Sequence, residues 1–262
     1  MQRIFLLRAY GDFVIALQAI AKSDKKIQVV ASEHLSPLYH ALLAARAIPP
    51  LSIEFIALGI QHGQLNFFTN KHLLSWGSWQ QLSLLKAYIK ANPNQEGIDY
   101  IEHDIRRSVF NCIVGHDFQA VVPADANVYN AYAEWLGLSV ANNTFNKIDN
   151  TSVLIFPDAR LKKKAISPAH IQRIVNTETN QNKQIKIAKF NNSNSTELSY
   201  SNFDELIMLI QDAEFIYTAD SLPTHIAQLL ETPHSIVYSF NGVNRFCTPF
   251  ALDNKSYIII HD

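Results

Sequence analysis

The sequence predicts an α/β protein of two domains, each built on a parallel sheet with helices on both faces. Short apolar runs alternate with helical patterns from the first residues. A polar, Asn-rich stretch at residues 141–151 interrupts them, and the alternation then restarts. Strands and helices that alternate at this spacing imply right-handed crossovers and parallel sheets. A chain of 262 residues has room for two domains, which we place at residues 1–148 and 149–262.

The first domain is predicted from buried apolar runs and helical patterns. The apolar runs predict strands at Ile4–Leu7, Ile27–Ala31, Ile53–Ala57, Asp99–Glu102 and Gln119–Val122. The helical patterns lie at Phe13–Ala21, Leu35–Ala45, Leu73–Ile89 and Val128–Leu136, with Gly137 as the stop of the last helix. In such sheets ligands bind outside the carboxyl ends of the strands, and the cleft between two domains is the default site.

The second domain repeats the same alternation. Strands are predicted at Val153–Phe156, Ile185–Phe190, Phe215–Thr218, Ser235–Tyr238 and Tyr257–Ile260. Helices are predicted at Pro168–Val175, Phe203–Gln211 and Ile226–Leu230. The polar stretches at 176–184 and 191–197 are predicted to be solvated loops.

Bulk properties narrow the class of protein. The formal net charge of -1 offers no general attraction for nucleic acid or acidic membranes, so any anion site must be local. Cys112 and Cys247 lie far apart without a metal-ligand spacing, which indicates two buried thiols in a reduced, cytoplasmic protein. The N-terminus does not read as a signal peptide, and no apolar stretch is long enough to span a membrane.

The first candidate site is RAYGDF at residues 8–13, where the first strand should pass into the first helix. Gly11 allows a tight turn, and Asp12 comes at the helix start, on the ligand-binding side of such a sheet. An Asp in this place is also an ordinary N-cap. The G-x-G-x-x-G fingerprint is absent here, which disfavours a nicotinamide or flavin enzyme.

The second candidate site is FPDARLKKKAISP at residues 156–168, after the first strand of the second domain. Lysine runs are usually solvated surface, and this interpretation is kept for Lys162 and Lys163. Arg160 and Lys164 also lie at the strand's carboxyl end, where they could clamp a diphosphate by charge-assisted hydrogen bonds.

The third candidate site is DSLPTHIA at residues 220–227. Asp220 and Ser221 are good helix N-caps, and Thr224 and His225 would follow in the first turn. By itself this is a well-capped helix start. Its position at another strand end lets it face the same cleft as Arg160 and Lys164, which favours an anion site instead.

Together these stretches resemble glycosyltransferase family 9, the heptosyltransferase-like enzymes of bacterial surface-glycan assembly. RIFLLRAYGDFVIALQAI resembles the family's opening strand and its Gly-Asp, and VLIFPDARLKKKAISPAHI resembles its Arg- and Lys-bearing segment. The most specific element is a "DSGPMH-A" type motif after a helix and a strand. ELIMLIQDAEFIYTADSLPTHIAQLLETPHSIVYSF is similar to it, including the Thr-Pro that follows the helix.

The resemblance implies a glycosyltransferase-B architecture of two Rossmann-like domains, with the second domain abbreviated here. The first domain would bind a glycan or glycolipid acceptor and the second a nucleotide-sugar donor, in an inverting reaction without a metal or other cofactor. Asp12 matches the general base. Arg160, Lys164 and the helix start at Asp220, Ser221, Thr224 and His225 would bind the donor diphosphate. The implied location is the cytoplasm, with peripheral contact at the inner face of the cell membrane and no nucleic-acid partner.

Two departures from the family keep a second interpretation open, that of a catalytically silent glycosyltransferase-like binding protein. Leu222 stands where the family usually has Gly, and the segment between Ile187 and Phe203 is shorter than expected. A nucleotide-sugar epimerase of the same architecture is a third interpretation. It would need additional acids near the cleft, for which Asp104 and Asp158 are the nearest candidates by position.

Weaker candidates lie in the first domain. Gly11, Arg106 and Arg107 are possible acceptor contacts, the two arginines because they follow a strand end. Trp76 and Trp79 could share a helix face, an arrangement that belongs more often to a core than to a sugar platform.

Overall fold

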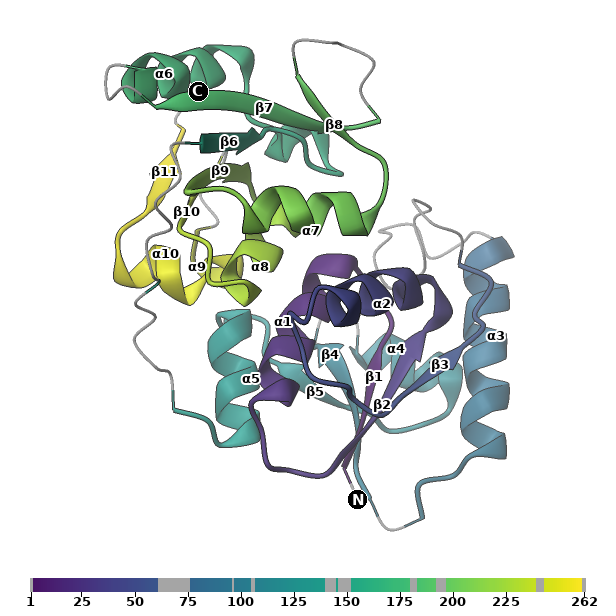
Figure 1. Ribbon diagram of the computed structural model, residues 1–262. Coiled ribbons are helices and arrows are strands. Elements are labelled where there is room, and N and C mark those ends of the chain that lie inside the picture. Colours follow the sequence, from purple (N-terminus) through teal and green to yellow (C-terminus); the bar gives the residue numbers. More distant parts are fainter. Residues whose placement is uncertain are drawn as a thin grey trace. The chain divides into compact units, whose positions relative to one another are not determined.

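The computed structural model describes residues 2–60, 76–95, 97–104, 107–139, 145, 152–179, 183–191, 197–238 and 243–260. The chain divides into two compact units. Unit 1 comprises Met1–His40 and Ile48–Ser139, and unit 2 comprises Ala41–Ala47 and Val140–Asp262. Each unit contains one parallel sheet with helices packed on it (Figure 1).

Unit 1 holds the five-stranded sheet, in the order β3-β2-β1-β4-β5, with every pair of neighbours parallel. Its strands are β1 (Gln2–Leu6), β2 (Ile27–Ser32), β3 (Ile53–Ile56), β4 (Asp99–His103) and β5 (Gln119–Val122). Its helices are α1 (Tyr10–Ala21), the short 3-10 helix η1 (Glu33–Leu35), α2 (Ser36–Ala44), α3 (Trp76–Ala91), α4 (Arg107–Val114) and α5 (Val128–Leu136). α2 crosses the boundary between the units at His40.

The apolar strands of unit 1 are covered on both faces, which explains their nearly continuous hydrophobic sequences. α3 and α4 pack together, and their side chains join those of β1 in one core cluster that includes Phe5, Leu85 and Phe110. Phe118 completes this cluster, and its ring meets that of Phe5 edge to face with centroids 5.2 Å apart. α1 packs against α5.

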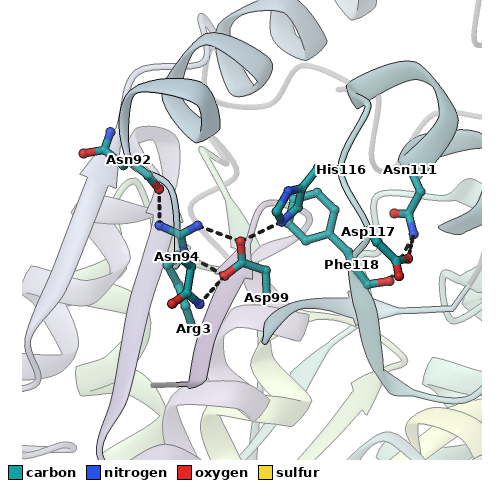
Figure 2. Close-up of polar contacts among 8 residues, drawn as sticks. All are labelled: Arg3, Asn92, Asn94, Asp99, Asn111, His116, Asp117 and Phe118. Carbon is teal, nitrogen blue, oxygen red and sulfur yellow. Dashed lines mark hydrogen bonds and ion pairs between the residues drawn. The ribbon is translucent and has the colours of Figure 1, made fainter. Parts of the chain in front are cut away.

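A buried ion-pair network joins the starts of β1 and β4 (Figure 2). Asp99 accepts two hydrogen bonds from the Arg3 guanidinium, at 2.9 and 2.6 Å, and a third from the Asn94 side chain at 2.8 Å. His116 Nε2 lies 2.7 Å from Asp99 Oδ2, and Arg3 also donates to the Asn92 carbonyl at 2.7 Å. Each charge in this network therefore faces a partner of opposite sign.

Unit 2 holds the six-stranded sheet, in the order β11-β10-β9-β6-β7-β8, again parallel throughout. Its strands are β6 (Ser152–Phe156), β7 (Gln184–Phe190), β8 (Leu198–Tyr200), β9 (Phe215–Ala219), β10 (His234–Tyr238) and β11 (Tyr257–Ile259). Its helices are the 3-10 helix η2 (Lys162–Lys164), α6 (Pro168–Thr179), α7 (Phe203–Gln211), α8 (Leu222–Leu229), α9 (Val243–Phe246) and α10 (Pro249–Asp253). α7 packs on α8, whereas Ile174 of α6 joins a core cluster with Ile155 and Val237.

The predicted elements are confirmed in kind, but several differ in their bounds. α1 begins at Tyr10 rather than Phe13, and α8 begins at Leu222 rather than Ile226. α6 runs to Thr179, so the start of the predicted loop at 176–184 is helical. Gly137 ends α5 in the left-handed conformation, as predicted.

The sequence analysis missed some short elements, namely α4, β8, α9 and α10. It also placed both thiols in the interior. Cys247 is buried, but Cys112 is exposed on α4, an element that the sequence analysis did not foresee. Of the predicted linker at 141–151, only Phe145 lies among the described residues. No helix in the described part of the chain is long and apolar enough to cross a membrane.

Candidate functional site

The strand orders of both sheets define where a site is expected. In a doubly wound sheet, ligands bind at the carboxyl ends of the two adjacent strands from which the chain departs in opposite directions. In unit 1 these strands are β1 and β4, and in unit 2 they are β6 and β9. Asp12 follows β1, whereas Lys164 follows β6 and Asp220 follows β9. Candidate residues from the sequence therefore lie at the switch point of each unit.

Asp12 lies in the first turn of α1 and is 7% exposed. Its Oδ1 is 3.2 Å from His103 Nε2, and its Oδ2 is 3.4 Å from Arg8 Nε. The N-cap of α1 is Ala9, which makes no side-chain capping bond, so Asp12 does not fill the capping role. Gly11 is inside the helix rather than in a tight turn before it. The carboxylate is thus held between a histidine and an arginine.

A second buried acid, Glu102, lies near the carboxyl end of β4 and interacts with Asp12 of α1. Glu102 is 2% exposed, and its Oε2 accepts a hydrogen bond from the Leu7 backbone N–H at 3.1 Å. Burial, and then the negative charge of Asp12, raise the pKa of Glu102 to about 8. On α5, burial and the same two carboxyl groups raise the pKa of Tyr132 well above its ordinary value, so its hydroxyl stays neutral. These residues form the acidic cluster: Arg8, Asp12, Glu102, His103 and Tyr132.

The sequence analysis did not single out Glu102, His103 or Tyr132. A signal was present in YIEHD at residues 100–104, where an acid and a histidine end an otherwise apolar strand. Polar side chains at the carboxyl end of a buried parallel strand are candidates for a site.

In unit 2, the ammonium of Lys164 contacts the carboxylate of Asp220, with 2.5 Å between Nζ and Oδ2. Lys164 ends η2 after β6, and Asp220 directly follows β9, so this pair joins the ends of two neighbouring strands. The Lys164 side chain is partly exposed, whereas Asp220 is buried. α8 begins two residues after Asp220, which places the positive end of a helix dipole beside the pair.

Phe246 of α9 extends this site. The Lys164 ammonium lies 5.5 Å from the centre of the Phe246 ring, and the Arg245 guanidinium lies 5.8 Å from it. The His225 ring is 6.5 Å from the same ring. Sequence reasoning missed Arg245 and Phe246 because their short helix was not predicted. We call Lys164, Asp220, His225, Arg245 and Phe246 the basic cluster.

The turn into α8 uses most of its hydroxyl groups internally. Ser221 is the N-cap residue but makes no side-chain capping bond; its hydroxyl donates to the Ala219 carbonyl at 3.2 Å. The Thr224 hydroxyl is buried and donates to the same carbonyl at 2.8 Å. Leu222 is the first helical residue and has no left-handed backbone, so this position does not require glycine. The structure thus uses both hydroxyl groups to fix the turn.

The other candidates from the sequence are mostly exposed, and one lies outside the described residues. Arg160 is exposed, and Lys162 and Lys163 are exposed as predicted. Arg107 begins α4 and pairs with Asp104 at 2.9 Å, whereas Arg106 lies outside the described residues. Asp158 is exposed. The side chains of Trp76 and Trp79 are 79% and 46% exposed, so neither belongs to the core, the role that the sequence favoured for them.

Within the described ranges, no group of three or more His, Cys, Asp or Glu side chains is arranged to hold a metal ion. The acidic cluster can accept a proton at a carboxylate, and the basic cluster can bind an anion.

Comparisons with known proteins agree with this fold. No protein-family model matches the chain, and no curated protein matches it by sequence. Among solved structures, E. coli heptosyltransferase WaaC with ADP has a TM-score of 0.58 at 10% identity, over 99% of this chain and 92% of that one. A glycosyltransferase family 9 protein from Veillonella parvula has a TM-score of 0.58 at 13% identity, over 100% and 85% of the two chains.

A third solved structure has the same fold. E. coli ADP-heptose lps heptosyltransferase II has a TM-score of 0.52 at 12% identity, over 99% of this chain and 89% of that one. The chain therefore has the fold of the heptosyltransferases and of glycosyltransferase family 9, as the sequence resemblance predicted. At these identities the likeness establishes the fold alone.

Proposed function

We propose that the protein is an inverting, metal-independent glycosyltransferase. It would move a sugar, with a heptose as the leading candidate, from a nucleotide-sugar to a lipopolysaccharide or other surface-glycan acceptor. The observation that carries the proposal is the basic cluster, which sets Lys164 and the start of α8 together at the switch point of unit 2. The fold adds support, since WaaC has been crystallised with ADP and with ADP-2-deoxy-2-fluoro heptose.

In this proposal the second domain, residues 149–262, binds the donor. A diphosphate would compete with the Asp220 carboxylate for the Lys164 ammonium, since both are anions that accept from the same donor. The α8 dipole favours a negative charge at the same place. Arg160, His225 and Arg245 would add positive charge or donors around the phosphates, whereas Ser221 and Thr224 would act through the turn that they fix.

The first domain, residues 1–148, would bind the acceptor through Asp12, Gly11, Arg106 and Arg107. Asp12 would remove the proton from the acceptor hydroxyl while that oxygen forms a bond to the anomeric carbon. The bond from this carbon to the donor phosphate breaks, and the nucleoside diphosphate leaves with the bonding electrons. Attack opposite the leaving group inverts the anomeric configuration. The leaving group departs as an anion and needs no proton, and cations such as Lys164 would stabilise it in place of a metal.

The remaining parts of the proposal concern partners and location. The partners would be the nucleotide-sugar and a glycan or glycolipid acceptor, with no nucleic acid. The protein would act in the cytoplasm and contact the inner face of the cell membrane peripherally when the acceptor is a glycolipid.

A catalytically silent binding protein is the second candidate, and particular features favour it. Leu222 adds a branched side chain at the start of α8, which would reduce the space for a phosphate group. The short segment between Ile187 and Phe203 would leave part of the nucleotide pocket missing. Such a protein would bind a partner or a glycan without turnover.

The test is to incubate the full chain with ADP-, GDP-, UDP- and dTDP-linked sugars, each with and without truncated lipopolysaccharide. Acceptor-dependent release of one nucleoside diphosphate, unaffected by EDTA, supports the proposal, and NMR of the product's anomeric centre reports inversion. Nucleotide binding without release under any condition supports the silent alternative. Release that EDTA abolishes overturns the metal-independent mechanism.

A further inference from the structure

The acidic cluster contains two carboxyl groups, and among the described residues one oxygen of Glu102, Oε1, is buried without a hydrogen-bond partner. We propose that Glu102 is a positioning residue that stays protonated at neutral pH and so leaves Asp12 as the single carboxylate of the cluster. The inference rests on the proposed function for the role of Asp12 as the base. The protonation state itself can be tested without any substrate.

The oxygens of Asp12 and Glu102 differ in their partners. Asp12 Oδ1 faces His103 Nε2 at 3.2 Å, and Asp12 Oδ2 faces Arg8 Nε at 3.4 Å. Glu102 accepts from the backbone N–H groups of Leu7, at Oε2, and of Arg8, but its Oε1 is buried without a hydrogen-bond partner among the described residues. A buried anion with an unpaired oxygen is costly, whereas a neutral acid at the same place costs much less. The negative charge is therefore better placed on Asp12.

The charges around Glu102 balance one carboxylate. Among the described residues, Asp12 and Arg8 act on Glu102 directly, Tyr132 on α5 interacts with both carboxyl groups, and His103 on β4 contacts Asp12. Arg8 supplies the permanent positive charge of this set, so one carboxylate balances it and a second would not. Two carboxyl groups in one buried site usually share a single proton for this reason.

The hydrogen bonds of Glu102 indicate which of its oxygens carries the proton. Since Glu102 Oε2 accepts from a backbone N–H, the proton belongs on Oε1, in the interior that also contains the Tyr132 hydroxyl. That hydroxyl is buried and has no hydrogen-bond partner among the described residues. Asp12 then remains ionised and able to accept a proton, while the bond from the Leu7 N–H holds Glu102 at the end of β1.

The test compares wild type with Glu102→Gln, which keeps the shape and the acceptor for the Leu7 N–H but cannot ionise. The folded-state pKa of Glu102, about 8, lies above its ordinary value of 4.5, so the folded protein holds the proton longer than the unfolded chain. Between about pH 5 and pH 8, the unfolding equilibrium constant of wild type should therefore rise about tenfold per pH unit relative to E102Q. Urea unfolding at each pH measures this ratio, and Glu134→Gln, at an exposed position of α5, is the matched control.

An infrared difference spectrum provides a second readout that a merely structural role would not change. Wild type minus E102Q should show the C=O stretch of a protonated carboxyl at pH 7, and this band should vanish above about pH 8. In Asp12→Asn this band should be lost at a lower pH than in wild type, because the negative charge that helps to raise the pKa of Glu102 is gone. If E102Q does not fold, the test compares only the pH at which this band is lost in wild type and in D12N.

Parallel unfolding curves for wild type and E102Q, or no protonated band at pH 7, would overturn the inference. A band whose loss on titration occurs at the same pH in wild type and D12N would overturn the coupling to Asp12. Neither measurement uses a nucleotide or an acceptor, so a failure to detect sugar transfer leaves both outcomes unchanged.

Discussion

The two ends of strand β4 carry buried acids in opposite situations. At its start, burial alone would raise the pKa of Asp99, but hydrogen bonds from Arg3, Asn94 and His116 lower it below its ordinary value. At its carboxyl end, burial and the charge of Asp12 raise the pKa of Glu102. One strand therefore holds an acid that is stabilised as an anion and, three residues further on, an acid that is stabilised as a neutral group.

This difference separates a stabilising network from a candidate site. Around Asp99 the charges are matched, and both carboxylate oxygens accept hydrogen bonds, an arrangement that favours one fixed conformation. Asp12 and Glu102 share the charge of one arginine, Arg8, and Glu102 Oε1 is buried without a hydrogen-bond partner among the described residues. Unbalanced buried groups with shifted pKa values are typical of functional sites, although structural networks can also shift pKa values.

The largest effect is expected from Asp12→Asn. Loss of a general base typically lowers a rate by about 10²–10⁴-fold, so turnover should fall by that amount. Nucleotide affinity should stay within a few-fold of wild type, because the donor site is assigned to residues of unit 2. Initial rates of nucleotide release and calorimetric titration measure the two quantities.

The matched control for this change is Asp24→Asn, at an exposed position of unit 1, which should leave both quantities unchanged. Full activity of D12N would refute the assignment of Asp12 as the base. The carboxyl end of β4 would then no longer be interpreted as a functional site.

The sequence could predict the framework because the strands are continuous apolar runs and the switch points follow from their order. Asp12 and Lys164 were found because they lie in the segments that follow such runs. Glu102 and His103 were missed because the direction in which a polar side chain points at the end of a strand depends on neighbours from distant segments. The bond from the Leu7 N–H to Glu102 spans 95 positions of sequence. Phe246 was missed because its helix is too short to show a helical period.

The next effect in size is expected from Asp99→Asn. Removing one partner of a buried ion pair typically costs about 3–5 kcal/mol, because Arg3 would keep a buried charge without its partner. Since the pKa of Asp99 is lowered in the folded state, this stabilisation is present above its ordinary value of 3.8 and is lost as the pH falls below it. Urea unfolding at pH 7 and at pH 3 measures both parts. A decrease of less than about 1 kcal/mol in the free energy of unfolding at pH 7 would show that the network at the start of β4 does not stabilise the fold.

A smaller effect is expected from His116→Ala. Its ring lies at the partly exposed edge of the network, 2.7 Å from Asp99 Oδ2 and with its centroid 4.6 Å from that of Phe118. A partly exposed pair of this kind contributes about 1 kcal/mol or less, so H116A should unfold at a slightly lower urea concentration than wild type. A loss of stability as large as that of D99N would mean that His116, rather than Arg3, is the main partner of Asp99.

The most direct test of the proposed function is nucleotide binding at Lys164. Thermal unfolding of wild type, Lys164→Gln and Lys162→Gln would be followed with ADP, GDP, UDP and dTDP, where Lys162 is an exposed neighbour on the same 3-10 helix. Ligand that binds the folded state raises the melting temperature. We predict that one nucleotide raises the melting temperature of wild type and K162Q but leaves that of K164Q unchanged. No increase in wild type with any nucleotide, or an equal increase in K164Q, would contradict the proposal.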